Sequence, residues 1–319
     1  MATTSAVGTG QQRAIDLNVV ARKQRSLWQD AFERLVRNKA AMGGLFILVL
    51  AAIAAIFAGT IAPYDPTKQD PRYNMFEPLW VGSQYTTTDH LLGTDQLGRD
   101  TLSRLIWAAR ISMIVGFVPT AIVFSVGIVV GLAAGFYGGW IDQVLMRITD
   151  VVYSFPDFLF LLIVVSVFRN TPVGAIFSGL FLIFLAFAVV GWVGVARLTR
   201  GQVLSLKEKE FVEAARAMGA SPVRIMTRHL LPNALAPLLV AMAFTVPLYI
   251  IFEATLSFLG VGIKPPTPSW GSMVNDGFAT FTANPWGVLL PAVCISVVMM
   301  AFTFFGDGVR DALDPRMKR

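Results

Sequence analysis

Six stretches of the chain are apolar and almost free of charge. Each is about as long as the roughly 20 helical residues that cross the hydrocarbon core of a bilayer. Two of them contain a single acid, Asp157 in one and Glu253 in the other. The pattern predicts an all-α membrane protein with six transmembrane helices. The helices are expected within residues 40–62, 111–141, 151–168, 173–196, 230–263 and 277–306.

The composition supports lipid as the main solvent of this chain. Of its 319 residues, 55% are hydrophobic and only 14% are charged, whereas soluble domains have about 25% charged residues. The single cysteine, Cys294, excludes a disulfide within the chain. The two histidines, His90 and His229, are far apart in the sequence. We therefore expect neither a zinc site nor any other metal site.

The basic residues are unevenly distributed among the segments between the predicted spans. An even number of spans places both termini on one side, and that side would carry 19 of the 26 lysines and arginines. Cytoplasmic segments are rich in these residues, so the net charge of +6 requires no nucleic acid as a partner. The segments expected in the cytoplasm are 1–39, about 142–147, 197–232 and 307–319.

The expected organisation has four parts. Residues 1–39 form a cytoplasmic tail, and residues 40–110 form the first transmembrane helix and an outer loop. Residues 111–306 form the membrane core, and residues 307–319 form a second cytoplasmic tail.

The polar N-terminal segment lacks the pattern of a cleavable signal peptide, because the first apolar run begins only at residue 40 and is long enough to span. Residues 1–24 are expected to be disordered. The stripe of residues 28–37 predicts a helix, either lying in the membrane interface or simply solvated.

The segment 197–232 is longer than a simple connector and predicts two short helices. Ser205 and Glu208 have the spacing of a capping box that begins the first helix. Gly219 is expected to end that helix with a positive φ. Ser221 followed by Pro222 is typical of an N-cap and first helical position, which begins the second helix. The apolar stripe of the first helix consists of Phe211, Ala214, Ala215 and Met218.

This helix-turn-helix has two interpretations. The small residues Ala214, Ala215 and Gly219 form a corner that another protein could approach closely. Similar turns occur in DNA-binding proteins, but the position between two predicted spans and the absence of a separate soluble domain disfavour a membrane-tethered DNA regulator.

The same segment resembles a known motif. Glu213-Ala214-Ala215, then Gly219 and Leu231-Pro232, have the spacing of the EAA loop of ABC importer permeases, with His229 at a position that is often aliphatic. The resemblance implies a type I importer fold in which this loop is a coupling helix that docks on an ATPase. The coupling residues it implies are Glu213, Ala214, Ala215, Gly219, Ser221, Pro222 and Arg224.

Three further segments resemble the dipeptide, oligopeptide and nickel branch of these permeases. The first runs from Leu92 to Arg104, where Asp100 and Arg104 also have the spacing of an ion pair on a helix. The second covers residues 256–271, with a proline-rich outer segment expected to be stiff, and the third covers residues 306–316.

The two acids in the apolar windows are candidates for the translocation path. Charges are costly in lipid, so such residues usually face a partner or a water-filled path. Glu253 would either attract the ammonium group of a peptide or accept hydrogen bonds from a neighbouring helix. Asp157 follows Pro156 and would cap a helix that restarts after a kink.

The resemblance implies a non-catalytic subunit of a bacterial inner-membrane importer. No phosphate-binding loop is present, so ATP and Mg²⁺ would be used by two partner ATPases and no cofactor would bind this chain. The other implied partners are a second, homologous permease and an extracytoplasmic binding protein. The expected substrates are di- or oligopeptides, with nickel complexes, glutathione or oligosaccharides as alternatives. A secondary transporter is the alternative of another class.

Overall fold

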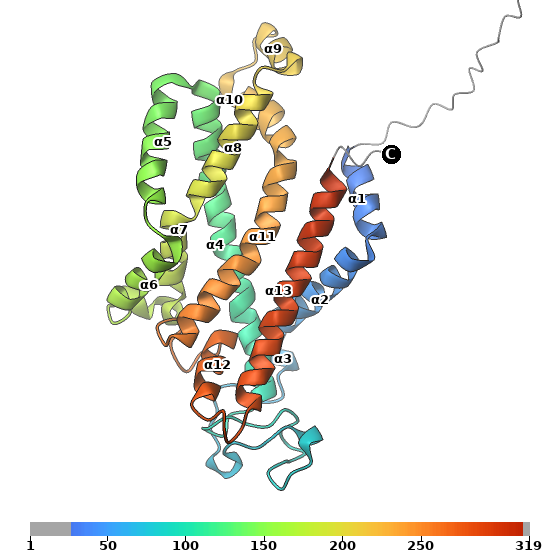
Figure 1. Ribbon diagram of the computed structural model, residues 1–319, viewed down its shortest axis with the longest axis vertical. Coiled ribbons are helices and arrows are strands. Elements are labelled where there is room, and N and C mark those ends of the chain that lie inside the picture. The colour runs from blue at the N-terminus through green and yellow to red at the C-terminus, as the bar shows by residue number, and fades with distance from the viewer. Residues whose placement is uncertain (1–26, 315–319) are drawn as a thin grey trace, which may run out of the picture.

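The computed structural model describes residues 27–314 and is built from helices (Figure 1). Within that range the only β pairing is an isolated bridge between Thr94 and Asp100. The first part of the chain contains α1 (Leu27–Arg37), α2 (Lys39–Ile56), α3 (Ala58–Ile61) and the short turns η1 (Pro71–Tyr73) and η2 (Leu79–Val81). The middle contains α4 (Thr101–Tyr137), α5 (Gly139–Tyr153), α6 (Asp157–Phe168), η3 (Val173–Gly179), α7 (Leu180–Val190) and α8 (Trp192–Leu206). The last part contains α9 (Glu210–Ala217), α10 (Pro222–Ile225), the π-helical turn η4 (Met226–Leu230), α11 (Leu231–Phe258), α12 (Trp270–Phe278) and α13 (Trp286–Leu313).

The prediction of six transmembrane helices is confirmed if one broken span is counted. Five helices of the described residues are long and apolar enough to cross a membrane, and the pair α5 and α6 forms a sixth candidate with a bend of 70°. The window 151–168 thus begins in one helix and continues in the next. Pro156 explains the break, because proline lacks an N–H and disfavours helical geometry in the residue before it.

Several boundaries differ from those predicted. Helix α8 continues to Leu206, so Ser205 lies inside a helix and the predicted capping box with Glu208 is wrong. The last span begins at Trp286, because residues 277–285 contain the end of α12 and a turn. Apolar composition alone does not separate a short helix from the long helix that follows it.

The two ends of the molecule differ in structure. Figure 1 places α9, the start of α1 and the end of α13 toward the upper end. Helix α12 and the blue-green loop that joins α3 to α4 lie at the lower end. The start and end of the described chain are close together, since the Arg34 side chain donates a hydrogen bond to the backbone oxygen of Asp314 (3.4 Å).

Helix α4 packs closely against α8 along a row of glycines. Gly127, Gly131 and Gly135 recur every fourth residue and therefore lie on one face of α4. A Cβ atom on Gly131 would lie 2.5 Å from the backbone oxygen of Ala196 and 2.5 Å from the Cβ of Thr199. Small residues permit such close backbone contact between membrane helices. These glycines therefore hold together α4 and α8, the two helices whose ends pack against the α9–α10 segment.

The predicted N-terminal helix is present as α1, which packs against the end of α13. A Cβ atom on Gly308 of α13 would overlap Ala41, and it would lie 3.2 Å from the Leu35 side chain. The Phe32 side chain of α1 is exposed, which suits a helix in the membrane interface. The expectation of disorder for residues 1–24 lies outside the described residues.

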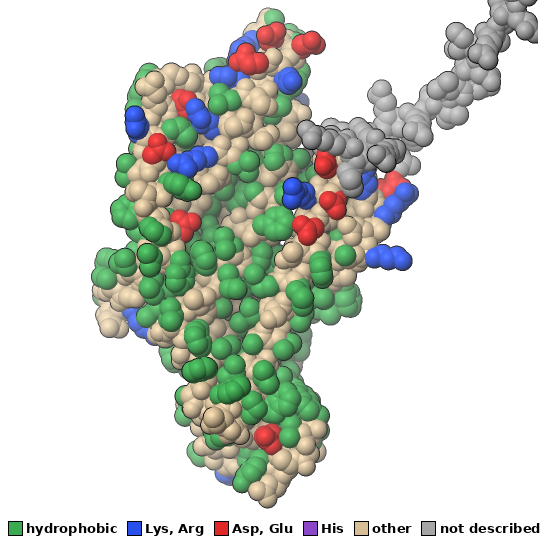
Figure 2. All heavy atoms as spheres, viewed as in Figure 1, with side chains coloured by type: hydrophobic (Ala, Val, Ile, Leu, Met, Phe, Trp, Pro, Cys, Tyr) green, Lys and Arg blue, Asp and Glu red, His purple; other side chains and the backbone are tan. Residues whose placement is uncertain are grey.

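The charges follow the same division between the ends. Figure 2 shows lysine, arginine and acidic side chains gathered over the upper part of the molecule, above a band that is mostly hydrophobic. This band has the character of a lipid-facing surface. The placement of α9 and both described chain ends at one end agrees with an even number of spans.

This arrangement makes a topological prediction. A single cysteine at Lys207, next to α9 in a Cys294→Ser background, should react with a membrane-impermeant maleimide only after cells are opened, because the upper end is expected in the cytoplasm. A cysteine at Ser83 in the outer loop should react in intact cells. Reaction of position 207 from outside would show that the orientation is wrong.

Candidate functional site

The first helix of the candidate site begins later than predicted. Its N-cap is Lys209, whose side chain makes no capping hydrogen bond. Glu210 and Glu213 lie in the first turn, where the helix dipole favours negative charge. These two acidic residues therefore stabilise the start of α9, which does not depend on the predicted cap at Ser205.

Helix α9 ends in a Schellman motif centred on Gly219. The Ala220 N–H donates to the Ala215 oxygen (3.0 Å), and the Gly219 N–H donates to the Arg216 oxygen (2.9 Å). Gly219 has a φ of +78°, as predicted. Side chains other than that of glycine are strained in this conformation. The motif therefore sets the direction in which the chain leaves α9.

The second helix starts as predicted. The Ser221 hydroxyl accepts a hydrogen bond from the Arg224 N–H (3.4 Å), and Pro222 occupies the first turn. The π-helical turn η4 then connects α10 directly to α11. A movement of the α9–α10 segment would thus act directly on a long helix.

A small hydrophobic core holds this segment to the ends of α4 and α8. Its buried members are Leu132, Val203, Val212, Ala215, Ile225 and Leu230. Ala215 is only 1% exposed, so the expectation that it lies on a partner-facing corner is wrong. Its small side chain serves the packing beneath the segment.

Glu213 forms no ion pair with Lys209 or Arg216 among the described residues. Arg216 instead lies over the ring of Phe136, 5.8 Å from its centroid. Glu213 is exposed. Its negative charge lies in the first turn of α9, where it stabilises the helix through the helix dipole.

The outer face of α9 and α10 is exposed and partly apolar. Met218 is 80% exposed, Val223 is 61% exposed and Phe211 is 39% exposed. Ala214 and Gly219 are also exposed, and no atom of residues 27–314 lies within 4 Å of a Cβ built on Gly219. Ser221, Pro222 and Arg224 lie on the same exposed turn. We refer to the exposed face of residues 211–224 as the coupling surface, because exposed apolar side chains such as those of Met218 and Val223 are typical of protein contacts.

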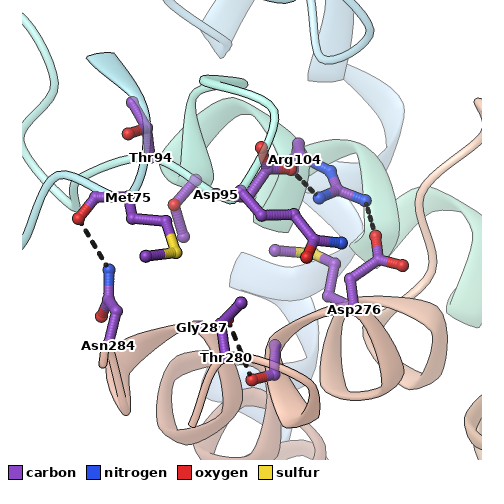
Figure 3. A pocket seen from close by; sticks show the side chains of 12 residues that line it. Met75, Thr94, Asp95, Arg104, Asp276, Thr280, Asn284 and Gly287 are labelled. Atoms are coloured by element: carbon purple, nitrogen blue, oxygen red, sulfur yellow. Dashed lines mark hydrogen bonds and ion pairs between the residues drawn. The ribbon is translucent and has the colours of Figure 1, made fainter. Parts of the chain in front are cut away.

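An interlocked ion-pair network lies at the opposite end of the molecule. Arg99 and Arg104 both contact Asp95, and both reach Asp276 of α12 with distances of 3.1 and 2.9 Å. Figure 3 shows Arg104 directed at Asp276, and Asn284 directed at the Met75 backbone. The network fixes the loop between α3 and α4, and the start of α4, to α12.

The predicted Asp100–Arg104 pair is therefore wrong. The Asp100 carboxylate accepts a hydrogen bond from the Ser103 N–H (2.7 Å), which caps α4, and it contacts His90 (2.9 Å). Asp100 is the N-cap and precedes α4, so its side chain does not have the geometry of an i,i+4 ion pair within a helix. The i,i+4 rule failed because it assumed helix at Asp100.

The solvent-exposed rim of the same loop carries a separate ion pair. Arg72 lies beside Asp70 (2.6 Å) and, by hydrogen bonding to its carboxylate, lowers the pKa of Asp70 to about 2. This carboxylate therefore remains charged throughout the physiological range.

Asp276→Asn should destabilise the end of the protein opposite α9. The change leaves two buried guanidinium groups with one carboxylate, so we expect a loss of about 2 kcal/mol in the free energy of unfolding. A thermal unfolding assay of the purified chain would measure it. Asp70→Asn is the matched control, since that ion pair is exposed, and it should leave Tm unchanged. Equal Tm values for both variants would contradict this role of the network.

The two acids of the apolar windows occupy different environments. Glu253 is fully buried, and its Oε1 accepts a hydrogen bond from Ser257 (2.6 Å) on the same helix. This geometry favours a structural role over contact with a substrate. Asp157 is exposed at the start of α6. The predicted cap is wrong in detail, because the N-cap is Pro156 and Asp157 is the first helical residue.

The family comparisons cover most of the chain. Residues 127–319 match the family described as binding-protein-dependent transport system inner membrane component. Residues 26–78 match the N-terminal TM domain of oligopeptide transport permease C. The second match covers α1, α2, α3 and the beginning of the loop between α3 and α4.

Individual relatives are similar over nearly their full length. The dipeptide transport system permease protein DppC of Bacillus subtilis is 41% identical over 97% of this chain and 92% of its own. The oligopeptide transport system permease protein OppC of the same organism is 38% identical over 95% and 94%. The glutathione transport system permease protein GsiD of Pectobacterium atrosepticum is 37% identical over 92% and 93%.

A solved structure supports the fold. A chain of the MetNI methionine ABC transporter, in an inward-facing conformation, aligns with a TM-score of 0.53 and 22% identity. The alignment covers 66% of this chain and 96% of the other.

Proposed function

The chain belongs to the family of binding-protein-dependent transport system inner membrane components, and from this premise we propose that it forms half of the membrane path through which an ATP-driven importer moves short peptides. Relatives named as dipeptide, oligopeptide and glutathione permeases support this substrate class. The single observation that carries the mechanism is the exposed coupling surface at the end of two long helices.

The mechanism follows from how this surface is held. The side chains of Val212 and Ile225 beneath it pack on α4 and α8, and η4 joins α10 to α11 without an intervening loop. A push on the coupling surface would therefore move long helices as rigid levers. We propose that two partner ATPases, using ATP and Mg²⁺, supply that push and that a second, homologous permease completes the path.

The remaining partner is an extracytoplasmic binding protein that delivers the peptide at the outer end, where α12 and the outer loop lie. Both chain termini and the α9–α10 segment are proposed to face the cytoplasm of a bacterial cell. A secondary transporter would leave the coupling surface without a role. Nickel complexes and oligosaccharides remain substrates to be compared with peptides in the same assay.

Purification and reconstitution test this function. The chain alone should hydrolyse no ATP, because it lacks a phosphate-binding loop. Co-expressed with its neighbours, it should bring the ATPases and second permease through purification. In proteoliposomes, the complex should hydrolyse ATP faster when peptide-loaded binding protein is added. Hydrolysis by the chain after complete removal of the ATPases would contradict the assignment, as would peptide-independent uptake of another substrate class.

A further inference from the structure

We infer that the turn η2 anchors the loop between α3 and α4 in the lipid headgroups at the end of the molecule opposite α9, with Trp80 as its main contact. The partner is the surface of the bilayer itself. The inference requires only that the chain spans a membrane, so it does not depend on the proposed substrate or on the ATPases.

The start of α13 marks the edge of the hydrocarbon core. Residues 286–306 of this helix are 21 consecutive residues without a charged side chain, and Asp307 follows them. At a rise of 1.5 Å per residue they are about 31 Å long, which matches the roughly 30 Å thickness of the hydrocarbon core. With Asp307 at one boundary of the core, Trp286 lies at the other.

Two contacts hold the turn η2 at the level of Trp286. The rings of Trp80 and Trp286 meet edge to face, with 5.5 Å between their centroids. The Asn284 side chain donates hydrogen bonds to the backbone oxygens of Met75 and Phe76 (both 3.3 Å). Figure 1 shows the blue-green loop beside the lower end of α13, and Figure 3 shows Asn284 directed at the Met75 backbone. The turn is therefore held at the depth of the lipid headgroups.

The surface of the turn has the composition of a membrane interface. Residues 78–88 contain no charged side chain. Trp80 is 56% exposed, and Leu79, Val81 and Tyr85 are exposed beside it. Tryptophan and tyrosine are enriched at membrane–water boundaries, because each ring has an apolar body and a polar group that hydrogen-bonds to headgroups or water. This segment therefore fits lipid headgroups on one side and acyl chains on the other.

Hydrogen bonds within the loop keep the turn in this shape. The Leu79 N–H donates to the Leu91 oxygen (3.0 Å), and the Glu77 N–H donates to the Tyr85 oxygen (2.8 Å). The Ser83 hydroxyl donates to the Glu77 carboxylate. The acid nearest to the turn is thus engaged within the loop.

The turn also continues an exposed apolar face of α13. Trp286, Leu289 and Val293 have the i, i+3, i+7 spacing of residues on one side of a helix. Leu289 and Val293 are exposed, and Trp80 packs against Trp286 at the end of this face. A soluble protein would meet a surface that projects beyond the headgroups, so the depth of the turn favours lipid as its partner.

The anchor has a mechanical consequence. Asp95 of the same loop pairs with Arg104 of α4 and with Arg99, and both arginines reach Asp276 of α12. A loop fixed at the headgroups would therefore hold the start of α4 and α12 at a constant depth in the bilayer.

Depth-dependent fluorescence quenching tests the anchor. In a Cys294→Ser background, Val81→Cys carries the dye NBD and leaves Trp80 in place. The protein is purified with the subunits that accompany it and placed in bilayers of phosphatidylethanolamine and phosphatidylglycerol. A lipid with a nitroxide near its headgroup should quench the dye about threefold more strongly than a lipid with a nitroxide at the chain end, because interfacial aromatic residues lie at headgroup level.

Gln69→Cys is the matched control in the same loop. Gln69 is exposed and adjoins Asp70, whose ion pair with Arg72 lies on the solvent-exposed rim. A dye at this position should be quenched by aqueous iodide and by neither nitroxide lipid.

Variants of Trp80 then assign the contact. Trp80→Asp should lower the headgroup quenching of the dye at position 81 to the level of the Gln69→Cys control. Trp80→Tyr, which retains an interfacial ring, should keep most of the quenching. Addition of peptide-loaded binding protein should leave it unchanged.

Four results would overturn the inference. Quenching at position 81 by iodide alone would place the turn in water, and protection from every quencher would mean that another subunit covers it. Loss of the lipid quenching on addition of the binding protein would identify the turn as a docking surface for that protein. Unchanged lipid quenching in Trp80→Asp would show that Trp80 is not the anchor.

Discussion

Gly219→Leu should abolish transport while the protein still reaches the membrane in normal amounts. Gly219 has a φ of +78° in the Schellman motif that ends α9, and leucine is strained there. Its side chain would also project from the coupling surface, since among the described residues no atom lies within 4 Å of the Cβ position. Strain and steric exclusion together should weaken the ATPase contact by about 2–4 kcal/mol.

Two further substitutions separate these effects. Gly219→Ala adds strain with little volume, whereas Gly219→Asn adds volume with less strain, because asparagine tolerates positive φ. Peptide uptake and ATPase co-purification should fall modestly in Gly219→Ala and in Gly219→Asn, and they should fall further in Gly219→Leu. Glu213→Ala should be milder than Gly219→Leu, because Glu213 forms no ion pair among the described residues and its contribution is to the first turn of α9. Normal transport by Gly219→Leu would mean that this segment is not the coupling element.

Gly131→Leu should prevent stable folding of the membrane core. The new side chain would meet the backbone oxygen of Ala196 and the Cβ of Thr199 at 2.5 Å, and the Arg200 nitrogen at 3.0 Å. Backbone atoms on a packed helix cannot move aside as a flexible side chain can. We expect a cost of about 3 kcal/mol, at the upper end for overpacking, seen as low yield and aggregated elution from a sizing column.

Gly194→Leu on α8 is the matched control. This glycine is exposed, and in the part of the chain that the structure describes no atom lies within 4 Å of its Cβ position, so the variant should elute as wild type. A normal elution profile and Tm for Gly131→Leu would show that α4 and α8 do not depend on the glycine row.

The sequence was a good guide where local chemistry decides the structure. The six apolar windows, the end of α9 at Gly219 and the start of α10 at Ser221 and Pro222 were all predicted, because each depends on residues adjacent in the chain. The assignment to ABC importer permeases was also predicted from the EAA-like spacing, and the family match confirms it. The broken span could have been expected from Pro156, although its angle depends on the packing of α5 and α6.

Features that depend on distant contacts were missed. The Ser205 and Glu208 spacing suits a cap, but α8 continues through it because Val203 packs against Gly135 of α4. Arg104 pairs with Asp95 and Asp276, the latter 172 residues away in the sequence, which no local rule predicts. Ala215 was predicted on the partner-facing side of α9, because the apolar stripe of this helix does not show by itself which face packs on α4 and α8. The repeat of glycines at 127, 131 and 135 was a visible signal for close helix packing.

The central claim is that residues 211–224 contact an ATPase, and site-specific photo-cross-linking tests it most directly. A photoreactive phenylalanine analogue at Met218, which is 80% exposed on the coupling surface, should form an adduct with the ATPase in the assembled complex. The same analogue at Phe281, 46% exposed between α12 and α13, should form none. An ATPase adduct at 218 and not at 281 is the predicted result. The absence of an adduct at 218, or its appearance at 281, would contradict the account.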